Sequence, residues 1–148
     1  MAERADDSSR EEEEEEEDPI ARYDPIRIQH DKDYVLSQLS LAPDELADWQ
    51  YKLRDYRYID RVEDLDYGGF LRWVPLEDPT TLVLTRGAHF CDLSPNGDGL
   101  QCKVGSPTQT TRYFTVPFSS SLVFQRLRLQ EKVAMRALGS QGILPTMR

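Results

Sequence analysis

The sequence has few of the features that mark secreted or membrane proteins. Its only two cysteines, Cys91 and Cys102, imply no disulfide framework, and an intracellular setting is expected. No apolar run approaches the roughly 18 residues of a membrane-spanning helix. The acidic N-terminus, MAERADDSSREEEEEEED, has no apolar core of a signal peptide. We therefore predict a protein that is not secreted and has no membrane partner.

The stretch YGGFLR at residues 67–72 spells the start of an opioid peptide, but the chain lacks the signals that release one. Such peptides are cut out after paired basic residues, and no two Lys or Arg residues are adjacent in this sequence. We interpret Gly68-Gly69 instead as a turn that leads into a strand beginning at Phe70.

Nucleotide, hydrolase and metal motifs are also lacking. The sequence has no phosphate-binding glycine loop and no G-x-S-x-G elbow, so we predict no catalytic residues, no cofactor and no small-molecule substrate. A zinc site from His30, His89, Cys91 and Cys102 lacks C-x-x-C spacing, and the cysteines are better interpreted as small apolar residues. The segment after Asp92 lacks the final glutamate of a calcium loop. We predict no metal site.

The net charge of −9 resides in one segment. Residues 1–18 hold eleven acids and two arginines, while the remaining 130 residues balance 16 acids with 16 bases. We predict a disordered acidic tail over 1–18, a single domain over 19–138 and a loose C-terminal tail over 139–148. The tail is either solubilising or binds a basic protein partner through its glutamate run: Glu11, Glu12, Glu13, Glu14, Glu15, Glu16 and Glu17.

Periodicity predicts helices near both ends of this domain. Pro43 suits a first helical position, and Leu46, Trp49 and Leu53 follow at helical spacing. Upstream, we expect an edge strand or extended arm at residues 26–28 and a short helical turn at 33–39. After Phe118, either a helix runs directly from the serines to about residue 138, or residues 122–127 complete the sheet and the helix begins near 128.

The middle of the chain is predicted to be β-rich, with strands at 69–76, 81–92, 100–104 and 112–118. Asn96-Gly97 favours a two-residue hairpin turn, which pairs Leu93 with Leu100 and Cys91 with Cys102. Short strands with Gly- and Pro-rich turns predict an α+β fold, in which an N-terminal and a C-terminal helix flank a small antiparallel, SH3-like β-barrel. The predicted core is Leu46, Trp49, Leu53, Ile59, Leu71, Trp73, Leu82, Leu84, Cys91, Cys102, Phe114, Val116 and Phe124.

Three segments, YRYIDRVEDLDYGGFLRWVPL at 56–76, RYFTVPF at 112–118 and VFQRLRLQEKVAMRAL at 123–138, carry a resemblance. Over about residues 50–138 the chain resembles small uncharacterised proteins of large nucleocytoplasmic DNA viruses. The matching residues are Arg57, Tyr58, Ile59, Leu65, Gly69, Phe70, Leu71, Arg72 and Trp73. The resemblance implies a viral origin and brings no active site with it.

The predicted function is that of a non-enzymatic interaction or structural protein. Besides the glutamate run, the candidate contacts are Tyr67, Arg72, Arg86 and the turn at 94–99, because small barrels bind through their edges and loops. The alternative is a nucleic-acid-binding module. It would use a basic helical stripe of Arg128, Lys132 and Arg136, with the acidic tail as an electrostatic brake.

Overall fold

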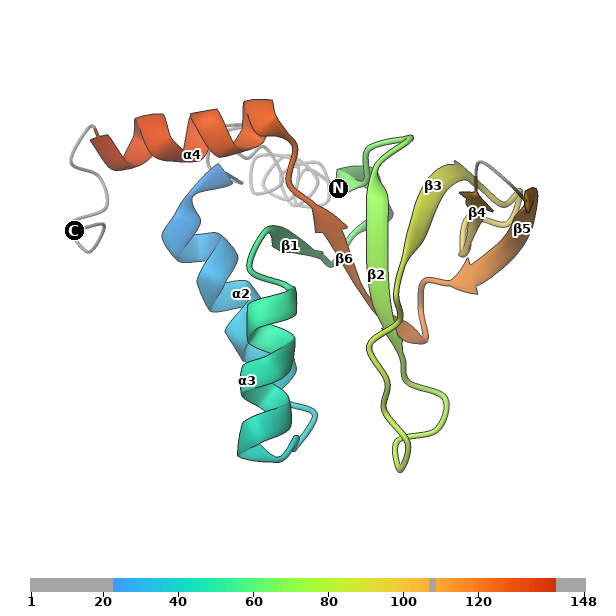
Figure 1. Cartoon of the computed structure of the whole chain (residues 1–148), viewed down its shortest axis with the longest axis horizontal. Coiled ribbons are helices and arrows are strands. Elements are labelled where there is room, and N and C mark those ends of the chain that lie inside the picture. The colour runs from blue at the N-terminus through green and yellow to red at the C-terminus, as the bar shows by residue number, and fades with distance from the viewer. Residues whose placement is uncertain (1–22, 107–108, 141–148) are drawn as a thin grey trace, which may run out of the picture. The chain divides into compact units, whose positions relative to one another are not determined.

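The structure is a computed structural model that describes residues 23–106 and 109–140 (Figure 1). Residues 29–128 form one compact unit, and the described residues 23–28 and 129–140 belong to a second one. The helices are α2 (Pro25–Ser37), α3 (Pro43–Lys52), α4 (Leu129–Ser140) and the short 3₁₀ helix η2 (Val62–Asp64). The strands are β1 (Tyr56–Ile59), β2 (Phe70–Pro75), β3 (Ala88–Leu93), β4 (Gly99–Ser106), β5 (Gln109–Pro117) and β6 (Ser121–Arg126). The predicted α+β class is confirmed.

The six strands form one antiparallel sheet with the order β1-β6-β2-β3-β4-β5. Among the described residues, β1 and β5 each have a neighbour on one side only, so the sheet is open. The predicted closed, SH3-like barrel is therefore wrong in its closure. Closure would need β1 to pair with β5, but β1 has four residues and is paired with β6 alone.

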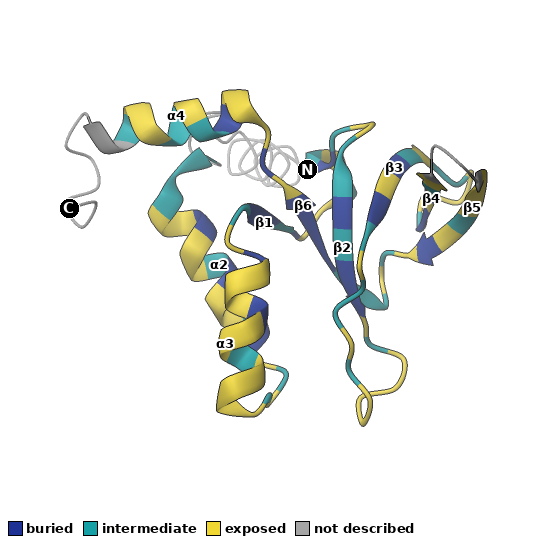
Figure 2. Cartoon of the chain, in the orientation of Figure 1, coloured by how far each residue is buried: buried dark blue, intermediate teal, exposed yellow. Residues whose placement is uncertain are grey.

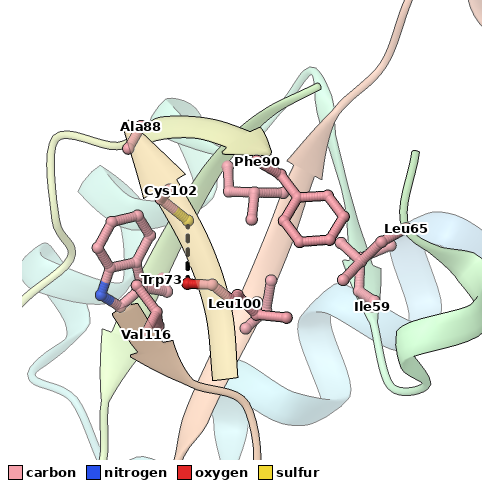
Figure 3. Packing of buried hydrophobic residues seen from close by; sticks show 10 residues of the cluster. Ile59, Leu65, Trp73, Ala88, Phe90, Leu100, Cys102 and Val116 are labelled. Carbon is pink, nitrogen blue, oxygen red and sulfur yellow. Dashed lines mark hydrogen bonds between the residues drawn. The ribbon is translucent and has the colours of Figure 1, made fainter. Parts of the chain in front are cut away.

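The sheet is bent, and its inner face holds the apolar cluster that has more fully buried residues. Alternation along β2 directs Leu71 and Trp73 inward, where they pack with residues of every other strand. The Trp73 and Phe114 rings lie 5.8 Å apart, which brings β5 across the inner face towards β2. Figure 3 shows Trp73 beside Val116, and the Cys102 thiol directed at the carbonyl oxygen of Leu100.

The outer face of β1, β6 and β2 packs against the α2–α3 helical hairpin within residues 29–128. Trp49 and Leu53 at the end of α3 lie in one cluster with Val74 and Phe124 of the sheet. The buried Lys32 donates from Nζ to the Leu53 carbonyl at 2.9 Å, so it caps the C-terminal end of α3. Desolvation by burial lowers the pKa of the Lys32 amine below its usual value.

The expected edge strand at residues 26–28 is wrong, because these residues lie in α2. Asp24 stands immediately before the helix, its carboxylate accepts from the Ile26 N–H at 3.0 Å, and Pro25 takes the first helical position. A capping aspartate followed by proline is a helix-start signal that outweighs the alternation of two isoleucines.

The predicted strand over 81–92 is too long, because pairing begins only at Ala88. Thr85 holds the preceding segment to β2: its hydroxyl oxygen accepts from Trp73 N–H, and its own N–H donates to the Trp73 carbonyl.

Strand β1 was not predicted from the sequence. After Phe118 the second alternative is confirmed, since β6 completes the sheet before α4 begins at Leu129.

The predicted hairpin register holds at its turn and fails at the cysteines. Leu93 pairs with Leu100 as expected, but a bulge at Cys91 shifts the register, so Cys102 faces Phe90. Cys91 is consequently half-buried and Cys102 buried. Most of the predicted core is buried, whereas Leu46, Leu82, Leu84, Cys91 and Phe114 are half-buried.

Among the helices that the structure describes, none is long and apolar enough to cross a membrane.

Candidate functional site

One end of the inner face is closed by a buried polar network around Gln125. The Gln125 side chain accepts from Asp66 N–H at 3.0 Å and donates to the Asp66 carbonyl at 2.9 Å. Arg57, directly opposite on β1, donates to the Asp64 carbonyl at 2.7 Å. The Asp66 carboxylate forms ion pairs with Arg128 at 2.8 Å and with Arg57 at 3.5 Å. We call these five residues the closed end.

The two glycines of the YGGF stretch form a turn that packs against this closed end. Gly68 has φ +83°, and Gly69 N–H donates to the Asp66 carbonyl, so the pair forms the expected turn. A Cβ at Gly69 would overlap the side-chain amide of Gln125. Arg57 and Gly69 of this network, and the core residues Leu65, Leu71 and Trp73, all lie in the segment at 56–76.

Among the described residues, no contact brings the candidate residues Tyr67, Arg72 and Arg86 together into one surface patch. The Tyr67 ring stacks on Phe90 with centroids 5.0 Å apart, although 61% of the residue is exposed. Arg72 is half-buried and donates from Nε to the Thr85 carbonyl at 2.8 Å, so it supports the fold. Arg86 is exposed.

The turn at 94–99 is held by its own polar groups. The Asn96 side-chain oxygen accepts from Asp98 N–H, and the Ser94 hydroxyl oxygen accepts from Gly99 N–H at 2.9 Å. Gly97 has φ +82° and donates from its N–H to the Ser94 carbonyl. The turn is therefore a longer loop than the two-residue form that the Asn-Gly pair predicts.

The three bases of the alternative nucleic-acid site do not all lie on one helix. Arg128 precedes α4 and forms an ion pair with Asp66. Lys132 is half-buried and Arg136 is exposed, both on α4. Since one of the three bases lies outside the helix, the stripe does not favour the nucleic-acid alternative, which stays a prediction. The glutamate run 11–17 lies outside the described residues.

The buried Cys102 thiol is unreactive at neutral pH. Burial raises the pKa of the Cys102 thiol to about 12, so this residue stays protonated. Within residues 23–106 and 109–140, no three His, Cys, Asp or Glu side chains are placed to hold a metal ion.

The clearest opportunity for binding is the outer edge of β5, which pairs with no strand in the described part of the chain. Phe118 N–H donates to the Asp98 carbonyl at 2.9 Å, and these residues continue the β4–β5 register. Hydrogen-bonded pairs alternate in antiparallel ladders, so Arg112, Phe114 and Val116 direct their backbone groups at β4. The backbone groups of Thr111, Tyr113 and Thr115 consequently point to the free side. We call these three residues the β5 edge.

A pocket of about 200 Å³ runs beside this edge. Trp73, Phe114 and Val116 form its apolar wall, and the outward-facing Thr115 and Pro117 also line it. Residues from both faces of β5 line the same pocket, so it follows the strand's free side. The remaining lining residues are Pro75, Glu77, Ser120 and Ser121. A cavity of about 150 Å³ holds a benzene molecule, so this pocket suits one apolar side chain.

Little protects the β5 edge in the way that natural sheets usually protect theirs. Pro117 at the end of the strand is the one proline in the described part of β5, and its missing N–H lies on the free side, where no ladder needs it. Tyr113 is 72% exposed. Figure 2 shows that β5 is largely exposed, in contrast to β2 and β6.

The sequence prediction located β5 but missed its edge. Its residues 109–117 read QTTRYFTVP, which combines three threonines with a single charge. This composition is typical of a strand, and the sequence alone does not reveal which strand lies outermost. No protein family, curated protein or solved structure matches the chain in the comparisons.

Proposed function

We propose that the chain is a non-enzymatic protein-interaction module that adds an extended segment of a partner to the β5 edge. The observation that carries this proposal is the coincidence of unpaired backbone groups with an apolar pocket along one strand. In strand addition, backbone hydrogen bonds supply affinity, and pockets for alternate side chains supply specificity.

The backbone N–H and C=O groups of β5 point in the directions that strand addition requires. Thr111, Tyr113 and Thr115 offer donors and acceptors to an added strand. On the inner face, Phe114 and Val116 lie beside the place that every second side chain of that strand would occupy. One such side chain would enter the pocket against Trp73, while its neighbours along the peptide would face away.

A pair of variants at one position tests the proposal. Thr115→Pro removes an edge-facing donor and, since this N–H points away from β4, leaves the β4 ladder intact. Thr115→Val keeps the donor and is the matched control. Random linear peptides are panned against the wild-type chain and both variants, and enriched peptides are then titrated individually.

We expect enriched peptides to bind the wild type and Thr115→Val with similar affinity and to bind Thr115→Pro at least tenfold more weakly. A thermal melt of each variant shows that the fold is retained. If no peptide is enriched, or if peptides bind Thr115→Pro as tightly as the wild type, the proposed mode is wrong.

A further inference from the structure

The charge along β4, β5 and β6 is of one sign. From Gly99 to Gln130 the sequence contains no aspartate and no glutamate, whereas it contains Lys103, Arg112, Arg126 and Arg128. This is a local excess, since the chain beyond residue 18 is neutral as a whole. The strand that carries the free edge therefore lies in a basic segment.

Two of these four bases are engaged within the fold. Arg128 pairs with Asp66 at 2.8 Å, and the Arg126 guanidinium lies 4.7 Å from the centre of the Phe70 ring. Arg112 and Lys103 form no ion pair with any residue in the described part of the chain. Both positive charges on the β4–β5 hairpin thus remain available to a ligand.

The position of Arg112 relates it to the pocket. Arg112 pairs with Val104, and Arg112, Phe114 and Val116 share the inner face because side chains alternate along a strand. Arg112 is exposed and lies four residues before Val116, beyond the pocket wall. A strand added along β5 would therefore bring one side chain to the pocket and another of the same face to Arg112.

The pocket itself disfavours an anion. Glu77 lines it, together with aromatic and apolar side chains. A carboxylate placed there would meet a like charge and lose its hydration, whereas a carboxylate beside Arg112 would meet an exposed guanidinium. These two environments assign an apolar residue and an acidic residue to different places on the same ligand.

We propose that the partner segment is an acidic extended peptide of another protein, with an apolar side chain in the pocket and a carboxylate four residues away beside Arg112. This inference rests on the proposed strand addition and specifies its ligand. The chain's own acidic segment, residues 1–18, is a poorer occupant, because Met1, Ala2 and Ala5 are its only apolar residues.

Short labelled peptides of threonine and serine, each with one leucine and one glutamate, test this assignment with the full chain. The glutamate stands four residues after or four residues before the leucine, which covers both strand directions. In the first control it is replaced by glutamine. In the second control it stands three residues away, which turns it to the opposite face. Binding is followed by anisotropy at low and physiological ionic strength.

We expect one of the two four-residue spacings to bind about fivefold more tightly than its glutamine and three-residue controls, with less difference at higher salt. Arg112→Glu should remove this preference, and a peptide with lysine in place of glutamate should regain the affinity on that variant. This charge exchange distinguishes a direct contact from a general effect of net charge.

The other outcomes each decide a point. If the glutamate and glutamine peptides bind equally and Thr115→Pro still abolishes binding, the acidic assignment is wrong and strand addition stands. If no leucine peptide binds and panning also fails, strand addition is wrong. A synthetic peptide of residues 1–18 that binds more tightly than every leucine peptide would overturn the assignment to a partner protein.

Discussion

The closed end and the β5 edge are the two ends of one sheet's inner face. Polar groups are buried and hydrogen-bonded at the first, and exposed at the second. At the closed end, the Gln125 amide and the Arg57 guanidinium are buried, and each bonds the segment at 64–66. At the β5 edge, the backbone groups of Tyr113 and Thr115 have no neighbouring strand among the described residues.

This contrast separates stability from binding within one domain. A buried polar network is costly to disturb, because each lost partner leaves a desolvated group unpaired. An exposed edge contributes little to stability, since water already satisfies its groups. We therefore expect substitutions at the closed end to destabilise the protein and substitutions at the β5 edge to change only what it binds.

Gln125→Leu should have the largest effect on stability. Leucine fills much of the same space but leaves the backbone N–H and carbonyl of Asp66 without the amide, which costs about 3 kcal/mol of unfolding free energy. Chemical denaturation measures the loss. Gln101→Leu, on the exposed face of β4, is the control and should change stability by less than about 0.5 kcal/mol. Equal effects of the two substitutions would contradict the role given to the closed end.

Gly69→Ala should destabilise the protein by about 2 kcal/mol, because its Cβ would overlap the Gln125 amide. Gly68→Ala has open space around its Cβ and only the positive φ to accommodate, at a cost of about 1 kcal/mol. The same denaturation experiment compares the neighbours. A Gly69→Ala protein as stable as the wild type would show that the turn and Gln125 are not tightly packed.

Stability should fall at alkaline pH because of Cys102. The raised pKa of about 12 keeps the thiol protonated in the folded protein, while the unfolded chain releases this proton above the ordinary value of 9.0. The free energy of unfolding therefore decreases between pH 9 and 12, by about 1 kcal/mol at pH 10. Cys102→Ala should remove this part of the pH dependence. An unchanged slope would place the thiol in a solvated site.

Arg112→Ala should have the smallest effect on stability, within about 0.5 kcal/mol, because its side chain is exposed and forms no ion pair in the described part of the fold. A larger loss, measured by the same denaturation, would mean that exposed side chains of strand β5 contribute to the stability of the fold. That result would remove the contrast between the two regions.

Local signals in the sequence predicted much of the fold. Pro43 with apolar residues at helical spacing predicted α3, and alternation predicted β2, β4 and β5 within a few residues. The prediction failed at one irregular strand pairing and at one local cap that the alternation concealed. The bulge at Cys91 and the capping of α2 by Asp24 overrode simple alternation.

The candidate site was harder to predict, since it depends on strand order. Tyr67 and Arg72 were predicted as contacts because small barrels bind through their edges and loops, yet the Tyr67 ring stacks on Phe90 and Arg72 donates to the Thr85 carbonyl. The β5 edge exists because β5 is the outermost strand and β1, at the other edge of the described sheet, does not pair with it. The lack of acidic residues from 99 to 130 can be read from the sequence. That this basic segment includes the outermost strand depends on the strand order, which the sequence does not show.

The most direct test of strand addition is hydrogen exchange of the β5 amides, measured by NMR with and without a saturating peptide obtained by panning. The account predicts that the amides of Thr111, Tyr113 and Thr115 gain protection, while those of Arg112, Phe114 and Val116, which already bond β4, change little. Protection confined to other elements, or no alternation along β5, would contradict it.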